Sequence, residues 1–149
     1  MRAVVTRVSA AQVEIAGAVT GEIQRGFLVL LGITHDDTRR EAEKLAEKIT
    51  GLRVFEDEAG KMNLSLADVG GSLLVVSQFT LYAGLKKGRR PDFIAAARPE
   101  TAIPLYERFL TACAEKGFPP QHGEFGADMQ VTSCNDGPVT LIYDTAELM

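Results

Sequence analysis

Short apolar runs separated by small turn residues fill the first 33 positions of the chain. Many of the apolar residues are β-branched and glycines stand between the runs, a combination that predicts a meander of strands. Residues 11–15 alternate apolar and polar side chains, as expected of a strand buried on one face. Residues 27–33 are apolar almost without interruption, which predicts a central strand buried on both faces.

The spacing of apolar residues changes to that of a helix after Thr34. Capping residues, two of them aspartates, precede apolar positions three and four apart, so the pattern predicts an amphipathic helix over residues 34–50. A second helix is predicted from Thr101, with Pro104 tolerated in its first turn and Gly117 at its exit.

Further strand-like runs lie between and after the two helices. A short strand is predicted from Arg53, and a buried strand begins at Leu73 and continues into residues 77–83. Residues 127–134 and 138–145 flank an Asn-Asp-Gly sequence and predict a closing hairpin.

The succession of these elements predicts one domain over residues 1–149, because no repeat or linker interrupts it. The expected class is α/β with α+β character: a mostly antiparallel, barrel-like sheet with two main amphipathic helices. A content of 46% hydrophobic and 24% charged residues is typical of globular proteins. No apolar stretch approaches the roughly 20 residues that cross a bilayer, so we expect no membrane association and a cytoplasmic location.

The chain carries 16 basic and 20 acidic residues, a net charge of −4, and so has no overall field that attracts a polyanion. Any contact with nucleic acid must therefore be local. Residues 84–91 predict an exposed loop with four cations beside two glycines, for which phosphate binding and simple solvation are equally open. The four cations are Lys86, Lys87, Arg89 and Arg90.

The common signatures of nucleotide, metal and nucleophile chemistry are absent. His35 and His122 are isolated in the sequence, and Cys113 and Cys134 belong to no metal-binding spacing. We therefore expect neither a metal ion nor a cofactor.

Two polar stretches interrupt strand-like runs. Ser77, Gln78 and Thr80 follow an apolar run directly, and an unpaired buried polar group costs roughly 1 to 3 kcal/mol. They form either an ordinary strand end in water or the wall of a polar pocket able to bind an oxyanion. In residues 135–138 the Asp-Gly pair favours a hairpin turn, but the following proline removes a ladder donor and leaves nearby carbonyls free.

The sequences SQFTL at 77–81 and NDGPVT at 135–140 resemble the two signature motifs of the D-aminoacyl-tRNA deacylases. Other segments, among them residues 2–23, 27–37 and 125–131, extend the resemblance over nearly the whole chain. It implies that family's fold and a homodimer with active sites at the subunit interface. It also implies an ester hydrolase that removes D-amino acids, or glycine, from the terminal adenosine of tRNA. That activity is a proofreading step of translation, and it spares L-aminoacyl-tRNA.

The resemblance also implies roles for individual residues. Ser77, Gln78, Phe79 and Thr80 map onto the wall that holds the ester and the terminal ribose. Gly137 and Pro138 map onto a cis-proline motif that reaches into the partner's active site and excludes L-amino acids. The remaining expectations are that Arg7 fixes the Gly-Pro loop, that Phe125 and Met129 border the site, and that Lys86, Lys87, Arg89 and Arg90 contact tRNA phosphates.

Two mechanisms and two noncatalytic alternatives stay open. An activated ester needs little beyond a positioned water and donors near the oxyanion, so assistance from the substrate's ribose 2′-hydroxyl is favoured. Thr80 as a covalent nucleophile is the competing mechanism and needs an adjacent base. The noncatalytic alternatives are an RNA-binding protein that only grips the acceptor end and a purely structural dimerisation module.

Overall fold

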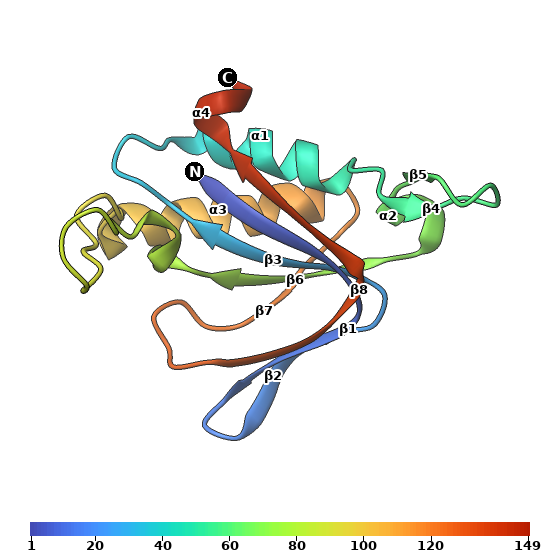
Figure 1. The fold of residues 1–149 in the computed structure, drawn as a ribbon, viewed down its shortest axis with the longest axis horizontal. Helices are drawn as coiled ribbons and strands as arrows, with labels where there is room; N and C mark the ends of the chain where they lie inside the picture. The colour runs from blue at the N-terminus through green and yellow to red at the C-terminus, as the bar shows by residue number, and fades with distance from the viewer.

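The computed structural model describes residues 1–149 as a curved β-sheet with two long helices on one face (Figure 1). The strands are β1 (Arg2–Ile15), β2 (Ala18–Ile23), β3 (Gly26–Gly32), β4 (Phe55–Glu56), β5 (Met62–Leu64), β6 (Ser72–Ser77), β7 (Gln121–His122) and β8 (Gln130–Asp144). The helices are α1 (Arg39–Thr50), α2 (Leu66–Val69), the 3₁₀ helix η1 (Phe79–Tyr82), α3 (Pro99–Glu115) and α4 (Thr145–Leu148). No helix is both long and apolar enough to span a membrane.

The main sheet is organised around β1, in which the predicted strand at residues 11–15 continues unbroken from the apolar run before it. Strand β8 runs along one edge of β1, while β3 and β2 share the other edge in antiparallel pairing. Strand β6 joins β3 in parallel, and β7 joins β6 in parallel. Because β2 and β7, at opposite ends of this order, contact each other, the sheet curls into a barrel-like roll. The predicted fold class is confirmed.

The two faces of the sheet are covered by separate apolar clusters. Phe27, Val29 and Leu31 of β3 point into the larger cluster, which packs under α1 and α3. Leu28 points the other way, into a smaller cluster inside the roll. The prediction that this segment is a central strand buried on both faces is therefore confirmed, and Figure 1 shows α1 and α3 covering the same side of it.

The predicted helices are present, with shifted starts. Helix α1 begins at Arg39 because Thr38 caps it, in a capping box with Glu41, and residues 34–37 form a turn instead. Helix α3 begins at Pro99, two residues before the predicted start, since proline suits the first helical turn.

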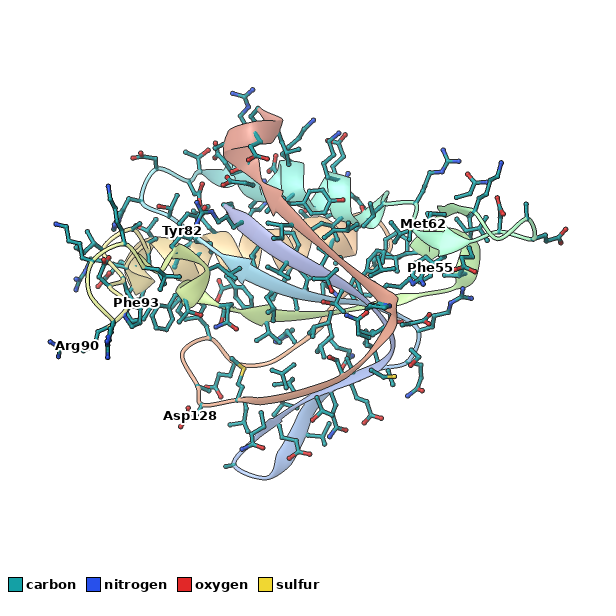
Figure 2. All side chains as sticks on the ribbon, in the orientation of Figure 1. Phe55, Met62, Tyr82, Arg90, Phe93 and Asp128 are labelled. Atoms are coloured by element: carbon teal, nitrogen blue, oxygen red, sulfur yellow. The ribbon has the colours of Figure 1, made fainter.

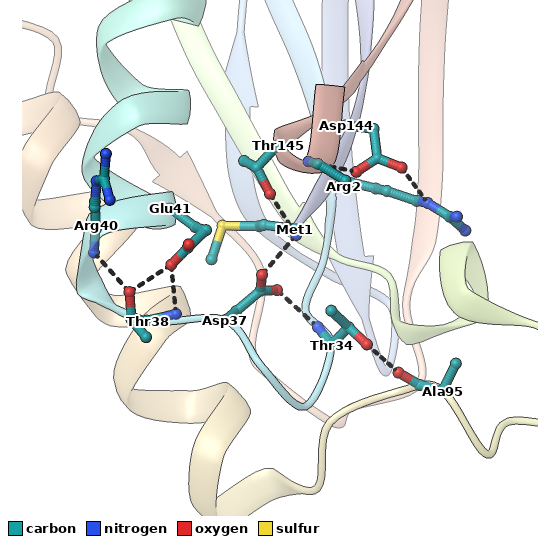
Figure 3. A network of polar contacts seen from close by, with 11 residues as sticks. Met1, Arg2, Thr34, Asp37, Thr38, Arg40, Glu41, Ala95, Asp144 and Thr145 are labelled. Carbon is teal, nitrogen blue, oxygen red and sulfur yellow. Dashed lines mark hydrogen bonds and ion pairs between the residues drawn. The ribbon is translucent and has the colours of Figure 1, made fainter. Parts of the chain in front are cut away.

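The N-terminus of the chain contacts the turn before α1 (Figure 3). The buried Met1 ammonium donates to Asp37 Oδ1 at 2.7 Å and to Thr145 Oγ1 of α4 at 2.8 Å. Asp37 Oδ2 also accepts from the Thr34 backbone N–H at 2.8 Å. The Met1 ammonium and the Asp37 carboxylate together tie the start of the chain to the turn before α1 and to the C-terminal helix.

Two strand predictions were wrong in extent, and one short helix was missed. The strand from Leu73 ends at Ser77, where the chain turns into η1 instead of continuing to residue 83. The strand expected from Arg53 is reduced to Phe55–Glu56, because only these residues pair with β5. The four residues of α2 were not anticipated.

The predicted closing hairpin is also wrong. Residues 130–144 form one long strand, β8, that follows β1 throughout. The Asp-Gly sequence does not reverse the chain, because Asn135 pairs with Val8 and Thr140 with Thr6 on the same side of the sheet. Four residues of β8 therefore lie opposite the single residue Arg7 and bulge from the ladder.

Candidate functional site: a cleft at the end of β6 and a loop in β8

The polar stretch after β6 begins where the sheet ladder ends. The Gln78 backbone N–H donates to Leu31 O at 2.8 Å, the last bond to β3, and Leu81 N–H then donates to Gln78 O as η1 begins. Ser77 and Gln78 are half-buried, whereas Phe79 and Thr80 are exposed. The Gln78 side-chain amide donates to the Thr80 hydroxyl oxygen.

Three of these four residues form one wall of an open cleft of about 540 Å³. Ser77, Gln78 and Phe79 line it from β6 and η1, and Thr80 stands just outside the lining. The opposite wall comes from the connection between β7 and β8 and includes Phe125, Gly126, Ala127, Asp128 and Met129. The structure thus brings Ser77, Gln78 and Phe79 together with Phe125 and Met129 around one cavity.

The opposite wall is held in place by packing. The Phe125 ring lies 5.7 Å from that of Tyr106 on α3, and the Tyr106 hydroxyl donates to Val75 O of β6 at 3.4 Å. Burial raises the pKa of Tyr106 to about 12, so this hydroxyl stays protonated near neutral pH. Gly123 leaves room for Met129, because a Cβ there would collide with the methionine sulfur.

Sequence reasoning missed Asp128, which carries the only ionisable side chain of the cleft lining. Figure 2 shows it at the end of the β7–β8 connection. Gly126, Ala127 and Val131 were missed as well. This connection has no hydrophobic period, so the only signal in the sequence was the resemblance of residues 125–131 to a family segment.

No three His, Cys, Asp or Glu side chains gather closely enough to hold a metal ion. The cleft offers hydroxyl, amide and backbone groups together with one carboxylate. Such a set can orient a polar substrate and donate hydrogen bonds to a developing oxyanion.

The second signature stretch forms the bulge in β8, where the Gly137–Pro138 peptide bond is cis. The buried Arg7 side chain donates from Nε to Asp136 O at 2.9 Å and from Nη1 to Val54 O at 2.6 Å. Asn135 Oδ1 accepts from Val139 N–H at 2.9 Å, which closes the base of the bulge. The side chain of Pro138 is left exposed.

Position 137 admits only a glycine. Its φ is +139°, a backbone conformation that L side chains rarely adopt, and an added Cβ would lie 3.0 Å from Arg7 Nη2 and 2.8 Å from a Val139 methyl carbon. Arg7 and Gly137 therefore fit one another, as a guanidinium fills the space that a side chain would need.

Within one chain the cleft and the bulge lie at opposite ends of the sheet. Arg7, beside the bulge, pairs with Phe27 near the start of β3, whereas Ser77 pairs with Leu31 near its end. Figure 1 shows the bend of β8 near the start of β3, away from the end of β6. The structure does not bring Gly137 and Pro138 to the cleft of their own chain.

The cationic loop follows η1 and projects from the same end of the sheet as the cleft. Gly84 and Asp92 close its base through two backbone hydrogen bonds of 2.8 and 3.0 Å. All four cations are exposed, and none of them forms an ion pair within the chain. Figure 2 shows Arg90 extending into solvent at the edge of the molecule.

Comparison with known proteins places this geometry in a family. A D-aminoacyl-tRNA deacylase of Thermus aquaticus is 60% identical over 99% of this chain and 97% of its own, and one of Chloroflexus aurantiacus is 59% identical over 99% and 92%. A solved structure of a c-Myc DNA unwinding element binding protein has a TM-score of 0.91 at 45% identity, covering 97% of this chain and 98% of its own.

A more distant solved structure supports the fold alone. It is described as a probable eukaryotic D-amino acid tRNA deacylase and has a TM-score of 0.83 at 16% identity over 95% of this chain and 97% of its own. The family model for D-Tyr-tRNA(Tyr) deacylase matches residues 4–144, a range that holds both the cleft and the bulge. The chain therefore belongs to the D-Tyr-tRNA(Tyr) deacylase family.

Proposed function

We propose that this protein hydrolyses the ester bond of D-aminoacyl-tRNA in the cytoplasm and releases the D-amino acid from the terminal adenosine. The observation that carries the proposal is that Ser77, Gln78 and Phe79 line an open cleft instead of ending a strand in bulk water. The family match and the relatives' names favour this substrate over other esters.

The active form we propose is a homodimer in which the bulge of one chain enters the cleft of the other. Two observations support it: the bulge is fixed from behind by Arg7, and it lies far from its own cleft. A rigid, exposed Pro138 from the partner would occupy the side toward which an L side chain points. Carbonyls beside Gly137 would accept from the substrate's α-ammonium. Rejection of L-amino acids is then steric, and glycine, which has no side chain, is hydrolysed as well.

For the chemical step we favour assistance by the 2′-hydroxyl of the substrate's own ribose. The Thr80 hydroxyl oxygen already accepts from the Gln78 amide, which engages one of its lone pairs. A covalent threonine also needs a base, and the one carboxylate of the lining, Asp128, belongs to the opposite wall. The first N–H groups of η1 have no partner within that helix and supply donors beside the ester.

The first test compares release of amino acid from D-tyrosyl-tRNA and L-tyrosyl-tRNA, with a chelator present. We expect fast release from the D form only. In Thr80→Ala, retained hydrolysis supports substrate assistance, whereas complete loss together with an acyl-enzyme trapped on wild type supports the covalent mechanism. Release from neither ester above the buffer rate contradicts the enzyme.

A second candidate is a noncatalytic nucleic-acid-binding protein on the same fold. The four unpaired cations of residues 86–90 favour it, as does the similarity to the 45% identical solved structure, whose name describes binding to a DNA element. The same assay separates the two, because a binder protects the ester from spontaneous hydrolysis whereas the enzyme accelerates it.

A further inference from the structure

Two aromatic side chains lie open to solvent where the cleft meets the cationic loop. Phe79 is 54% exposed and Phe93 is 39% exposed. Their ring centroids are 5.0 Å apart and the rings meet edge to face at 69°. Phe79 also lines the cleft, so this pair, here named the aromatic platform, continues the cleft wall outward. An exposed aromatic pair beside a cleft is typical of a binding surface.

The segment that carries Phe93 is anchored to the body of the protein. Its neighbour Asp92 is paired with Gly84 through two backbone hydrogen bonds. Two residues after Phe93, the Ala95 carbonyl oxygen accepts a hydrogen bond from the Thr34 hydroxyl at 2.6 Å, a contact drawn in Figure 3. The Phe93 ring therefore projects from a fixed backbone. Because the site is already ordered, stacking a ligand on the ring costs little conformational entropy of the protein.

The charge next to the platform is mainly positive, with four cations against one acid, Asp92, which precedes Phe93. Residues 86–90 carry four cations, no acid and no internal ion pair, in a chain whose net charge is −4. Figure 2 shows Phe93 and Arg90 on the same side of the molecule. Aromatic faces beside unpaired cations match the two needs of a single-stranded nucleic acid, a surface for its bases and counter-charge for its phosphates.

We propose that the aromatic platform stacks an unpaired base of the RNA strand, that of the nucleotide preceding the one whose ester enters the cleft. This inference rests on the proposed function, since it takes the terminal nucleotide to occupy the cleft. Phe79 belongs to both surfaces, so the two sites are contiguous and suit successive nucleotides of one strand. Stacking tolerates any base, while the adjacent cations hold the phosphates.

The test uses Phe93→Ala and two substrates with the same ester, D-tyrosyl-tRNA and D-tyrosyl-adenosine, which has no preceding nucleotide. Loss of one stacked base is expected to raise KM for the tRNA by roughly 5- to 100-fold. The increase in KM for D-tyrosyl-adenosine is expected to be much smaller. In Phe93→Trp, which keeps an aromatic face, the ratio of the KM values for the two substrates is expected to equal that of wild type. Ile94→Ala is the matched control, because Ile94 is apolar and 80% exposed but offers no stacking face.

A direct binding measurement separates this inference from the proposed function. Wild type is expected to bind a short uncharged oligoribonucleotide with an unpaired 3′ end more tightly than Phe93→Ala does, by fluorescence anisotropy. Equal affinity for the oligoribonucleotide and equal KM for the tRNA in the two proteins overturn the proposed stacking role, even if wild type hydrolyses D-tyrosyl-tRNA. A shift of Phe93→Ala from dimer to monomer in sedimentation, with unchanged oligonucleotide affinity, also overturns it. Loss of oligonucleotide binding in Phe93→Ala supports it even if neither ester is hydrolysed.

Discussion

At the scale of single residues, Arg7 holds the bulge of β8 in place. Its guanidinium is buried, donates to the carbonyls of Asp136 and Val54, and fills the space that a side chain at Gly137 would need. Position 7 lies within a strand, where the sequence shows only two adjacent polar residues, Thr6 and Arg7, between apolar ones. Its partners are 47 and 129 positions away, so no local pattern predicts these contacts, and only the family resemblance pointed to Arg7.

Arg7→Lys is expected to loosen the bulge, because one ammonium cannot reach two separate carbonyls as the guanidinium does. Each buried carbonyl left without a donor costs about 1 to 3 kcal/mol, so urea unfolding should show a loss of that order. Hydrolysis of L-tyrosyl-tRNA relative to the D form should rise in the same variant. Arg40→Lys, on the exposed surface of α1, is the control and should leave both quantities unchanged.

Asp37→Asn is expected to destabilise the fold, since it leaves the buried Met1 ammonium without its counter-charge. Breaking a buried ion pair from one side costs about 3 kcal/mol or more. The matched control is Asp36→Asn at the exposed neighbouring position, which should change the free energy of unfolding little. Equal unfolding midpoints for the two variants in urea would show that the ammonium needs no carboxylate.

At the scale of elements, the sequence predicted those helices and strands that local patterns define, and it failed where contacts with distant strands define them. Helix α1 and strand β3 repeat their apolar residues regularly, and the sequence predicted both. The Asp-Gly turn in β8 failed as a local signal because Asn135 and Thr140 both pair with β1. The end of β6 failed similarly, since the Gln78 N–H to Leu31 O bond that marks it depends on a distant strand.

Thr38→Ala should shorten α1 by removing its capping box and should cost about 1 kcal/mol at pH 7. The pKa of Glu41 lies below its ordinary value, mainly because the Thr38 side chain hydrogen-bonds to the carboxylate. A lowered folded-state pKa contributes stability above the unfolded pKa, and this contribution is lost as pH falls through the folded pKa. The difference between wild type and variant in urea unfolding should therefore shrink on acidification below about pH 4. A difference independent of pH would exclude the ionised Glu41 from the cap.

At the scale of the whole molecule, the cleft and the bulge that should close it face different ends of the sheet. In the proposed homodimer the bulge of each chain enters the cleft of the other, and a two-fold axis would form both contacts at once. The sequence contains both the cleft residues and the bulge residues as motifs, but it does not specify the distance between them, which follows from the topology of β1, β3 and β8.

Mixing two variants tests this arrangement. Gln78→Ala is expected to inactivate its own cleft, and Pro138→Ala to hydrolyse both the D and the L ester. In an equal mixture, random pairing gives half of the intact clefts a partner that carries Pro138. The rate of L-tyrosyl-tRNA hydrolysis should therefore fall to about half of its value before the subunits exchange. An unchanged rate of L-ester hydrolysis after subunit exchange would mean that each bulge serves its own chain.

The measurement closest to the central claim is the ratio of kcat/KM for D-tyrosyl-tRNA and L-tyrosyl-tRNA, in wild type and in Pro138→Ala. We expect wild type to hydrolyse only the D ester, and Pro138→Ala to lose discrimination by at least roughly tenfold, about 1.4 kcal/mol, through faster hydrolysis of the L ester. Unchanged rejection of the L ester by a folded Pro138→Ala protein would contradict the role assigned to the bulge, and hydrolysis of neither ester by wild type would contradict the function itself.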